Sequence, residues 1–175
     1  MKGPDIRQAQ QLSPEESQQL WGWSDDIFGT AALKLAYRPK TGDEIRFVLY
    51  ADPHGPVSHA AVLKHHARAN ERAVLIGGIG GVVTIPAAQR RGHAAMLLSH
   101  ATNFLRDEWS VDFALLFCID RMREYYERRG WRKVERDVLI NQPAGKVSSP
   151  FHVMTMPFKP EFEIIDSLDL DSASW

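Results

Sequence analysis

The feature that most constrains this fold is a strand, a tight turn and a helix that follow one another directly. The run Ile79–Ile85 is apolar and β-branched, which is typical of a buried strand, and Pro86 closes it. Downstream, apolar side chains recur at helical spacing and define one helix face: Ala94, Leu97, Leu98, Ala101, Phe104 and Leu105. A turn that opens directly into a helix leaves backbone N–H groups unpaired. The segment 89–94, which we call the cradle, is therefore predicted to bind an anion such as a pyrophosphate.

The residue types in the cradle fit that prediction. Gly92 lets the backbone approach a ligand without a Cβ, and the small Ala94 does nearly the same. Arg90 and Arg91 add positive charge at the rim. The predicted cofactor-binding residues lie on the strand and in the cradle: Val82, Val83, Thr84, Gln89, Arg90, Arg91, Gly92, His93 and Ala94.

Two nucleotide-binding motifs are excluded. The sequence has no G-x-x-x-x-G-K-[ST], so it does not predict an ATP or GTP P-loop. The glycines of Gly77–Gly81 miss the G-x-G-x-x-G spacing and precede the end of the strand. The remaining pattern, [Q/R]-x-x-G-x-[G/A] after a strand, resembles the acyl-CoA loop of the GCN5-related N-acetyltransferases (GNAT family).

A second signature follows about thirty residues later. Asp112–Ile119 is an apolar run that predicts a central strand, and the segment Arg121–Trp131 resembles the family's arm. In that arm a tyrosine, here Tyr126, lies on a short helix four residues before Gly130-Trp131. The resemblance implies an α/β (α+β) GNAT fold: a mixed, mostly antiparallel twisted sheet of six to seven strands flanked by helices. Splayed central strands would hold acetyl-CoA as co-substrate, and no metal is expected.

The chemistry of the family assigns further roles. Tyr126 is the predicted general acid, because a phenol can protonate a departing thiolate; the alternative is a packing aromatic. The strand Val82–Thr84 would pair with the pantetheine arm. Gly80 and Gly81 favour a bulge that frees an N–H to polarise the thioester carbonyl, or else they only allow close packing.

The general base and the role of the cysteine stay open. The base candidates are His65, His66, Asp120, Asp25 and Asp26. Strand alternation places the two histidines on opposite faces, so at most one can face the cleft, and Asp120 could instead cap the next helix. Cys118 is either a nucleophile or, as is usual for a buried thiol, part of the packing.

Composition bounds the rest. A chain of 175 residues fits one domain, 1–175, and a net charge of −1 excludes recruitment of nucleic acid or an anionic membrane by a global field. The single cysteine excludes an internal disulfide and favours a reducing compartment. No apolar stretch follows Lys2, and Ala73–Ala88 is too short to span a bilayer. We therefore expect a cytoplasmic protein.

Local patterns predict the remaining elements. Ser13-Pro14 with Glu16 indicates a capped helix start, and the segment 23–42 reads as loop and irregular helix. Strands are expected over 5–10, 44–51, 57–69, 131–140 and 152–156, with a turn at 141–145 that extends as loop to Pro150. The acidic tail 160–175 is either a solvated extension or folds back so that Trp175 lines the acceptor site.

Within the family, residues 54–131 and the ending most resemble the aminoglycoside 2′-N-acetyltransferases. That resemblance predicts a small, cationic amine as acceptor, bound by Asp25, Asp26, Gly80, Gly81 and Trp175. One departure is Gly80, which stands where those enzymes carry an acidic residue. Acetylation of a peptide N-terminus or lysine, and non-catalytic acyl-CoA binding, remain alternatives. Family members are often dimers, so a homodimer is also expected.

Overall fold

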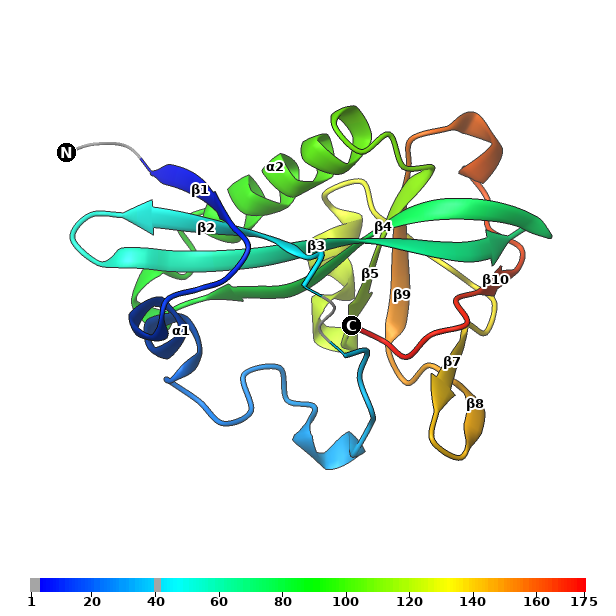
Figure 1. Ribbon diagram of the computed structural model, residues 1–175, viewed down its shortest axis with the longest axis horizontal. Helices are drawn as coiled ribbons and strands as arrows, with labels where there is room; N and C mark the ends of the chain where they lie inside the picture. Colours follow the sequence, from blue (N-terminus) through cyan, green and yellow to red (C-terminus); the bar gives the residue numbers. More distant parts are fainter. Residues whose placement is uncertain (1–3, 40–41) are drawn as a thin grey trace.

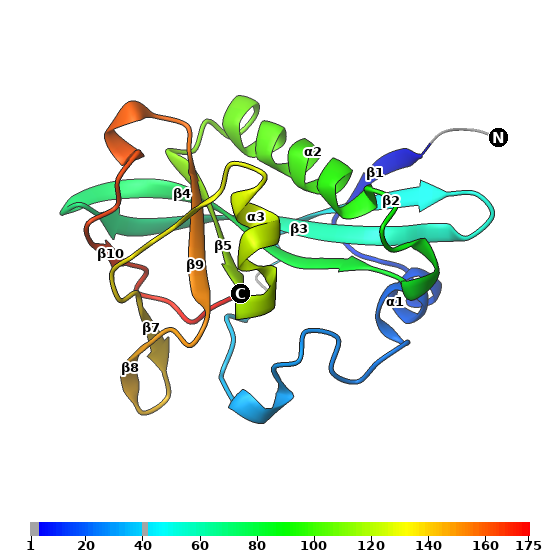
Figure 2. The same cartoon turned by 180° about the vertical axis from the view of Figure 1, so that it is seen from behind.

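One twisted sheet of ten strands organises residues 4–39 and 42–175, the part of the chain that this computed structural model describes (Figures 1 and 2). The strands are β1 (Asp5–Ala9), β2 (Ile45–Ala51), β3 (Gly55–Ala69), β4 (Arg72–Thr84), β5 (Phe113–Cys118), β6 (Arg132–Lys133), β7 (Leu139–Gln142), β8 (Gly145–Ser148), β9 (His152–Pro157) and β10 (Leu168–Asp169). The helices are α1 (Pro14–Trp21), α2 (His93–Asp107) and α3 (Arg123–Glu127), with single 3-10 turns η1 (Ala31–Leu33), η2 (Pro86–Ala88), η3 (Asp120–Met122) and η4 (Pro160–Phe162). The predicted α/β architecture, a mixed and mostly antiparallel sheet flanked by helices, is confirmed, with ten strands in place of the six to seven expected.

The central strands separate part of the way along their length. β1 to β4 form an antiparallel ladder, whereas β4 and β5 pair in parallel only from Ile76↔Phe113 to Ile79↔Leu116. Beyond Ile79, β4 continues to Thr84 without a partner on its β5 side within the described residues. The resulting opening is the splay that the family resemblance predicts.

The two faces of the sheet have different cover. α2 packs along one face of β2, β3, β4 and β5, while α1 and the segment 22–39, which we call the strap, lie on the other side (Figure 1). The Ser13 hydroxyl accepts from Glu16 N at 3.1 Å and the Glu16 carboxylate accepts from Ser13 N at 2.7 Å. This is the predicted capping box, and it fixes the start of α1.

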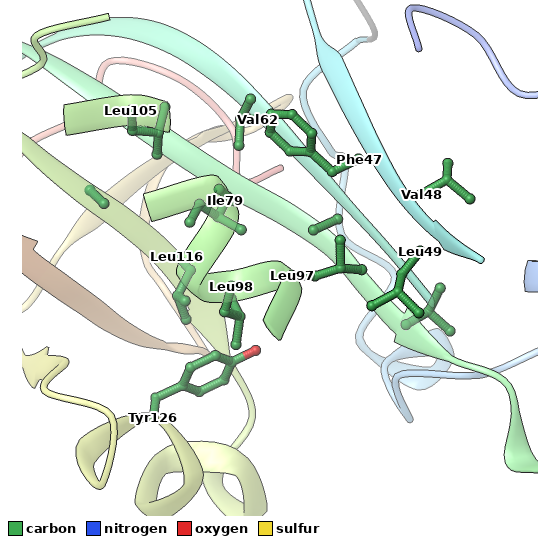
Figure 3. Close-up of a cluster of buried hydrophobic side chains, with 14 of the residues drawn as sticks. Phe47, Val48, Leu49, Val62, Ile79, Leu97, Leu98, Leu105, Leu116 and Tyr126 are labelled. Atoms are coloured by element: carbon green, nitrogen blue, oxygen red, sulfur yellow. The ribbon is translucent and has the colours of Figure 1, made fainter. Parts of the chain in front are cut away.

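The buried side chains form two clusters. The first lies between α2 and the sheet and includes Phe47, Leu97 and Leu105, with Tyr126 at its edge (Figure 3). The second contains Ile76 and Phe113 together with residues from the last part of the chain, such as Leu168 and Leu170. The tail (residues 160–175) is therefore part of the core, and its interpretation as a solvated extension is wrong.

Two strand predictions also need correction. The strand expected from Trp131 to Ile140 is interrupted: β6 ends at Lys133, and the chain then leaves β9 and reaches the opposite edge of the sheet at β7. The connection between β6 and β7 contains the charged residues Glu135, Arg136 and Asp137. All three are exposed, as charged side chains usually are, so this segment does not continue the strand into the sheet. The loop expected up to Pro150 contains β8, which forms a hairpin with β7.

Candidate active site

A cavity of about 550 Å³ opens where β4 and β5 separate. Its floor is formed by β4 from Ile79 to Thr84 and by β5 from Leu116 to Cys118. Side chains of α1, the strap, β2, α3 and the tail complete the wall. Segments distant in the sequence therefore meet around one space, large enough for a small ligand.

A bulge in β4 shapes this floor. Ala61 pairs with Gly80 and His59 pairs with Val83, so two residues of β4, Gly81 and Val82, face one residue of β3. Gly81 has a φ of +58°, a left-handed conformation that side chains other than glycine rarely adopt. The predicted bulge is present, and its residues Gly81 and Val82 line the floor of the cavity.

His59 holds the bulge in place. Its side chain is fully buried, and Nδ1 donates to Gly81 O at 2.7 Å. Nε2 lies 3.4 Å from Arg46 Nη1, and Arg46 pairs with the Glu44 carboxylate at 3.1 Å. The chain Glu44–Arg46–His59–Gly81 therefore connects the rim of β2 to the bulge through consecutive polar contacts.

The cradle is joined to β4 by the single turn η2, and its last two residues begin α2. Gln89 donates from Nε2 to Thr84 O at 3.0 Å and lines the cavity together with Val82, Val83 and Thr84. Gly92 is the N-cap of α2, with open space where a Cβ would stand.

The other cradle residues do not line the cavity itself. Arg90, Arg91 and Gly92 are exposed beside it, and Ala94 is half-buried in the first turn of α2. His93 is buried, and burial followed by the charge of Arg91 lowers its pKa, so its ring is neutral at neutral pH. A co-substrate that reaches from the cavity to the start of α2 would contact both the cavity-lining residues and the exposed cradle residues.

Tyr126 and Cys118 lie close together on the α3 side of the cavity. The Tyr126 ring is buried and its hydroxyl points toward Leu98 of α2 (Figure 3). Burial, with smaller effects of Cys118 and Tyr125, raises the pKa of Tyr126, so the phenol keeps its proton at neutral pH. Burial also raises the pKa of Cys118 to about 11, which leaves the thiol uncharged and a poor nucleophile. Tyr125 lies outside this cavity under the Arg129 guanidinium, 3.6 Å from its ring centre.

The acids expected to bind the acceptor lie elsewhere. Asp25 is exposed, and the Asp26 carboxylate accepts from Thr30 N at 2.8 Å and Ala31 N at 3.2 Å. Neither residue lines the cavity. The Asp26 carboxylate thus stabilises a turn of the strap, and its role in acceptor binding stays a prediction.

Three further base candidates are also outside the cavity lining. His65 Nε2 donates to Leu170 O at 2.6 Å, and His66 is exposed on the opposite face of β3. Asp120 caps no helix but accepts from His152 Nε2 at 2.8 Å. The acidic and imidazole side chains that do line the cavity, within the described residues, are Glu44 and His59. Sequence reasoning missed both, although a histidine inside the apolar run Val57–Val62 was a signal of a buried polar group.

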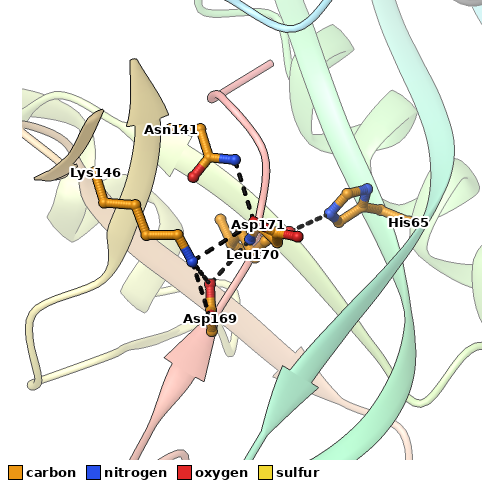
Figure 4. A network of polar contacts seen from close by, with 6 residues as sticks. All are labelled: His65, Asn141, Lys146, Asp169, Leu170 and Asp171. Carbon is orange, nitrogen blue, oxygen red and sulfur yellow. Dashed lines mark hydrogen bonds and ion pairs between the residues drawn. The ribbon is translucent and has the colours of Figure 1, made fainter. Parts of the chain in front are cut away.

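Trp175 lies at the end of the tail, and the fold places it in the cavity. The tail returns along β3 and β7, where Lys146 and Asn141 hold Asp169 and Asp171, and His65 holds Leu170 (Figure 4). The indole then lies against β4, so that a Cβ on Gly78 would stand 2.6 Å from the ring and one on Gly80 3.3 Å from it. Glycine at position 78 therefore makes room for the Trp175 ring, which lines the cavity.

Across residues 4–39 and 42–175, no group of three or more His, Cys, Asp or Glu side chains is arranged to hold a metal ion. No helix in the same ranges combines the length and apolar character needed to cross a membrane.

Comparisons with solved structures support the fold. A GNAT family acetyltransferase from Staphylococcus aureus Mu50 has a TM-score of 0.58 at 12% identity, over 90% of this chain and 100% of the other. A GNAT family acetyltransferase from Elizabethkingia anophelis with acetyl-CoA bound has a TM-score of 0.56 at 9% identity, over 88% and 97%. N-acetylglutamate synthase from Neisseria gonorrhoeae, complexed with coenzyme A and N-acetyl-glutamate, gives 0.55 at 16% identity, over 90% of this chain and 36% of the other.

Sequence comparison identifies the family. No curated protein matches the sequence significantly. The acetyltransferase (GNAT) domain family matches residues 8–134, which include the bulge, the cradle, Cys118 and Tyr126. Structures with this fold bind acetyl-CoA or coenzyme A, as two of the three above show. The chain belongs to the GNAT family of acetyltransferases and is an N-acetyltransferase.

Proposed function

We propose that this chain transfers the acetyl group of acetyl-CoA to a primary amine of a small acceptor, with Tyr126 as general acid. The observation that carries the proposal is the bulge of β4 at Gly81, which lies on the wall of the cavity that Tyr126 and Cys118 also line. A strand N–H freed by the bulge can donate a hydrogen bond to the thioester carbonyl oxygen, and a protonated phenol can donate a proton to the leaving sulfur.

In the proposed reaction the neutral amine attacks the thioester carbonyl carbon. The carbonyl oxygen takes up negative charge and accepts a hydrogen bond from the backbone at the bulge. The C–S bond then breaks, the sulfur leaves as a thiolate, and Tyr126 supplies its proton. The amine loses one proton to water or to Glu44, the one carboxylate side chain among the described residues that line the cavity. His59 is a positioning residue, because it holds the Gly81 carbonyl.

Replacement of the phenol tests the role of Tyr126. Tyr126→Phe is expected to lower kcat about 100-fold, the lower end of the usual effect of a general acid, without weakening acetyl-CoA binding. Tyr125→Phe is the matched control, because its ring stacks under Arg129 outside the cavity. Thiol release measures kcat and calorimetry measures acetyl-CoA affinity. An unchanged rate, or an equal loss of cofactor affinity, would remove Tyr126 from the mechanism.

An aminoglycoside is the finer candidate for the acceptor. The position of Trp175 on the cavity wall favours it, because the resemblance predicts that a terminal tryptophan contacts this acceptor. The charges favour it less, because Asp25 and Asp26 lie outside the cavity and Glu44 already pairs with Arg46. Thiol release with a 2′-amino and a 2′-hydroxyl aminoglycoside tests this candidate. Turnover of the amino compound alone would support it, and turnover of neither would reject it.

The remaining alternatives make different demands on the site. A peptide acetyltransferase would need an open groove where the tail lies, so removal of residues 169–175 should then raise its activity. A small-molecule enzyme should lose acceptor affinity instead. A non-catalytic acyl-CoA-binding domain would bind acetyl-CoA and release no thiol with any amine. A homodimer and a cytoplasmic location stay predictions from the sequence.

A further inference from the structure

Three residues at the contact between the strap and the tail each have a buried side-chain polar atom without a hydrogen-bond partner. Within residues 4–39 and 42–175, four buried side-chain atoms have no partner, and three of them are Arg38 Nη1, Ser174 Oγ and Trp175 Nε1. Arg38 N donates to Ser174 O at 2.8 Å, so the three residues are held together. Buried polar groups are nearly always paired, because an unpaired one destabilises the folded state. The unpaired atoms therefore indicate a missing hydrogen-bond partner, to which Arg38 and Trp175 can only donate and Ser174 can also donate.

This junction belongs to the wall of the active-site cavity. Arg38 and Trp175 both line the cavity, and the indole lies against Gly80 beside the bulge of β4. A group bound to these donors would consequently be close to the position of the thioester. The guanidinium is permanently charged and its planar fork matches an oxyanion, which can accept from several donors at once.

The charged side chains around the cavity also favour an anionic ligand. Among the described side chains that line it, Arg38, Arg46 and Arg121 are cationic and Glu44 is the only acidic one, while the main-chain oxygen of Trp175 also lies beside Gly80. The Glu44 carboxylate is already paired with Arg46 at 3.1 Å. The two remaining cationic side chains, Arg38 and Arg121, favour an anion.

The strap supplies an apolar surface to the same cavity. Trp23, Phe28 and Tyr37 line it and are 38%, 41% and 46% exposed. Exposed aromatic side chains gathered at the rim of a cavity are available to cover the apolar body of a ligand. The site thus combines an oxyanion position with an aromatic wall.

We propose that the acceptor is a primary amine that also carries an oxyanion, held by Arg38, Ser174 and Trp175, and an apolar body covered by the strap. Aromatic and other apolar amino acids have this chemistry when the oxyanion is a carboxylate. Amines with a phosphate share the anion but differ in its geometry. The inference rests on the proposed acetyl transfer and names the class of its acceptor.

Matched pairs of amines test the oxyanion. The pairs are phenylalanine with phenethylamine, tryptophan with tryptamine, and O-phosphoethanolamine with ethanolamine. Thiol release gives kcat/KM, and thermal unfolding of the CoA-saturated protein reports binding independently. The first member of at least one of these pairs is expected to be the better substrate and to raise Tm. The carboxylate and phosphate pairs distinguish the two oxyanions.

Variants locate the oxyanion at the three donors. Arg38→Met is expected to lower the ratio of kcat/KM within a favoured pair about tenfold to a hundredfold, the usual value of a charged hydrogen bond. Arg136→Met is the control, because Arg136 is exposed in the loop between β6 and β7. Ser174→Ala should lower the ratio less. Without ligand, its Tm should equal or exceed that of the wild type, because an unpaired donor has been removed.

The outcomes separate this inference from the proposed function. Preference for the amines without an anion, an unchanged ratio in Arg38→Met, or neither reaction nor binding of any anionic amine would overturn the inference. Acetylation of phenethylamine or tryptamine would leave the acetyl transfer standing in each of these cases. Conversely, Arg38-dependent binding of an anionic amine without thiol release from any amine would support the oxyanion site and reject the transfer.

Discussion

Gly81 decides the local geometry of the site, because its φ of +58° allows the bulge of β4. A side chain there costs about 1–2 kcal/mol of left-handed strain, and its Cβ would also lie 3.3 Å from the His59 ring. Gly81→Ala is therefore expected to lower both stability and kcat. Gly55→Ala, with a φ of +73° and open space around it, should lose similar stability and keep its activity. Urea unfolding and thiol release measure the two effects; equal losses of kcat in both variants would contradict a role for the bulge.

Cys118 offers a second test at the scale of a residue, because its position leaves two roles open. It lines the cavity beside Tyr126, yet its pKa of about 11 keeps thiolate below about one part in a thousand at pH 7.5. Cys118→Ala is therefore expected to keep kcat within about threefold, whereas loss of a nucleophile would abolish turnover. Slow alkylation of the free protein at pH 7.5 is the matching chemical measurement. Abolished turnover in a folded variant would restore Cys118 as a nucleophile.

At the scale of elements, apolar packing holds the tail more strongly than its ion pairs do. Lys146 and Asp169 pair at 3.0 Å, but their side chains are 41% and 49% exposed, and such pairs contribute about 0–1 kcal/mol. Leu170 is fully buried, so Leu170→Ala should cost about 2–5 kcal/mol of unfolding free energy.

Leu139→Ala on the adjacent β7 is the control for this prediction. Leu139 is 42% exposed, and its loss should cost only about 0.5 kcal/mol. Urea midpoints compare the two variants with the wild type. A loss in Leu170→Ala no larger than in Leu139→Ala would show that the tail does not contribute to the core.

Elements with a local pattern were predictable and those defined by distant partners were not. Helix periodicity after the cradle, the capping box at Ser13 and the arm around Tyr126 are all contained in a few neighbouring residues. β10 has only two residues, too few for a period, and exists because it pairs with β3 and β7. The interrupted strand after Trp131 is a similar case, since its two parts join opposite edges of the sheet.

The same limit applies to the site at the scale of the whole molecule. The proposed co-substrate side comes from one continuous stretch, β4 to α2, and its bulge and cradle were predictable from glycine placement. The proposed acceptor side is built by the strap, β2 and the tail, which meet only in the folded chain. No local pattern in the sequence distinguishes Arg38 and Glu44 from other charged residues. The acidic pair Asp25 and Asp26 was predicted instead, and neither of these residues lines the cavity.

His65 links the stability of the whole chain to pH through the docked tail. Burial is the largest effect on the pKa of His65 and lowers it. The hydrogen bond to Leu170 raises this pKa, and the charge of Arg38 lowers it further, so the net shift is downward. The unfolded chain therefore binds more protons than the folded one just below the ordinary histidine pKa of about 6.5. The contribution of His65 is complete above about pH 6.5 and is lost as the pH falls through 6.5 toward the lower folded pKa.

Stability should consequently fall between about pH 7.5 and 5.5, before most carboxylates titrate. Burial lowers the pKa of His93 in the same direction, so His65→Gln should remove part of the slope and leave a remainder. His54→Gln, in the exposed turn between β2 and β3, is the control. Urea midpoints across this pH range measure the slope. If His65→Gln kept the full slope, the half-buried ring of His65 would not be a source of the pH dependence, which would then come from other groups.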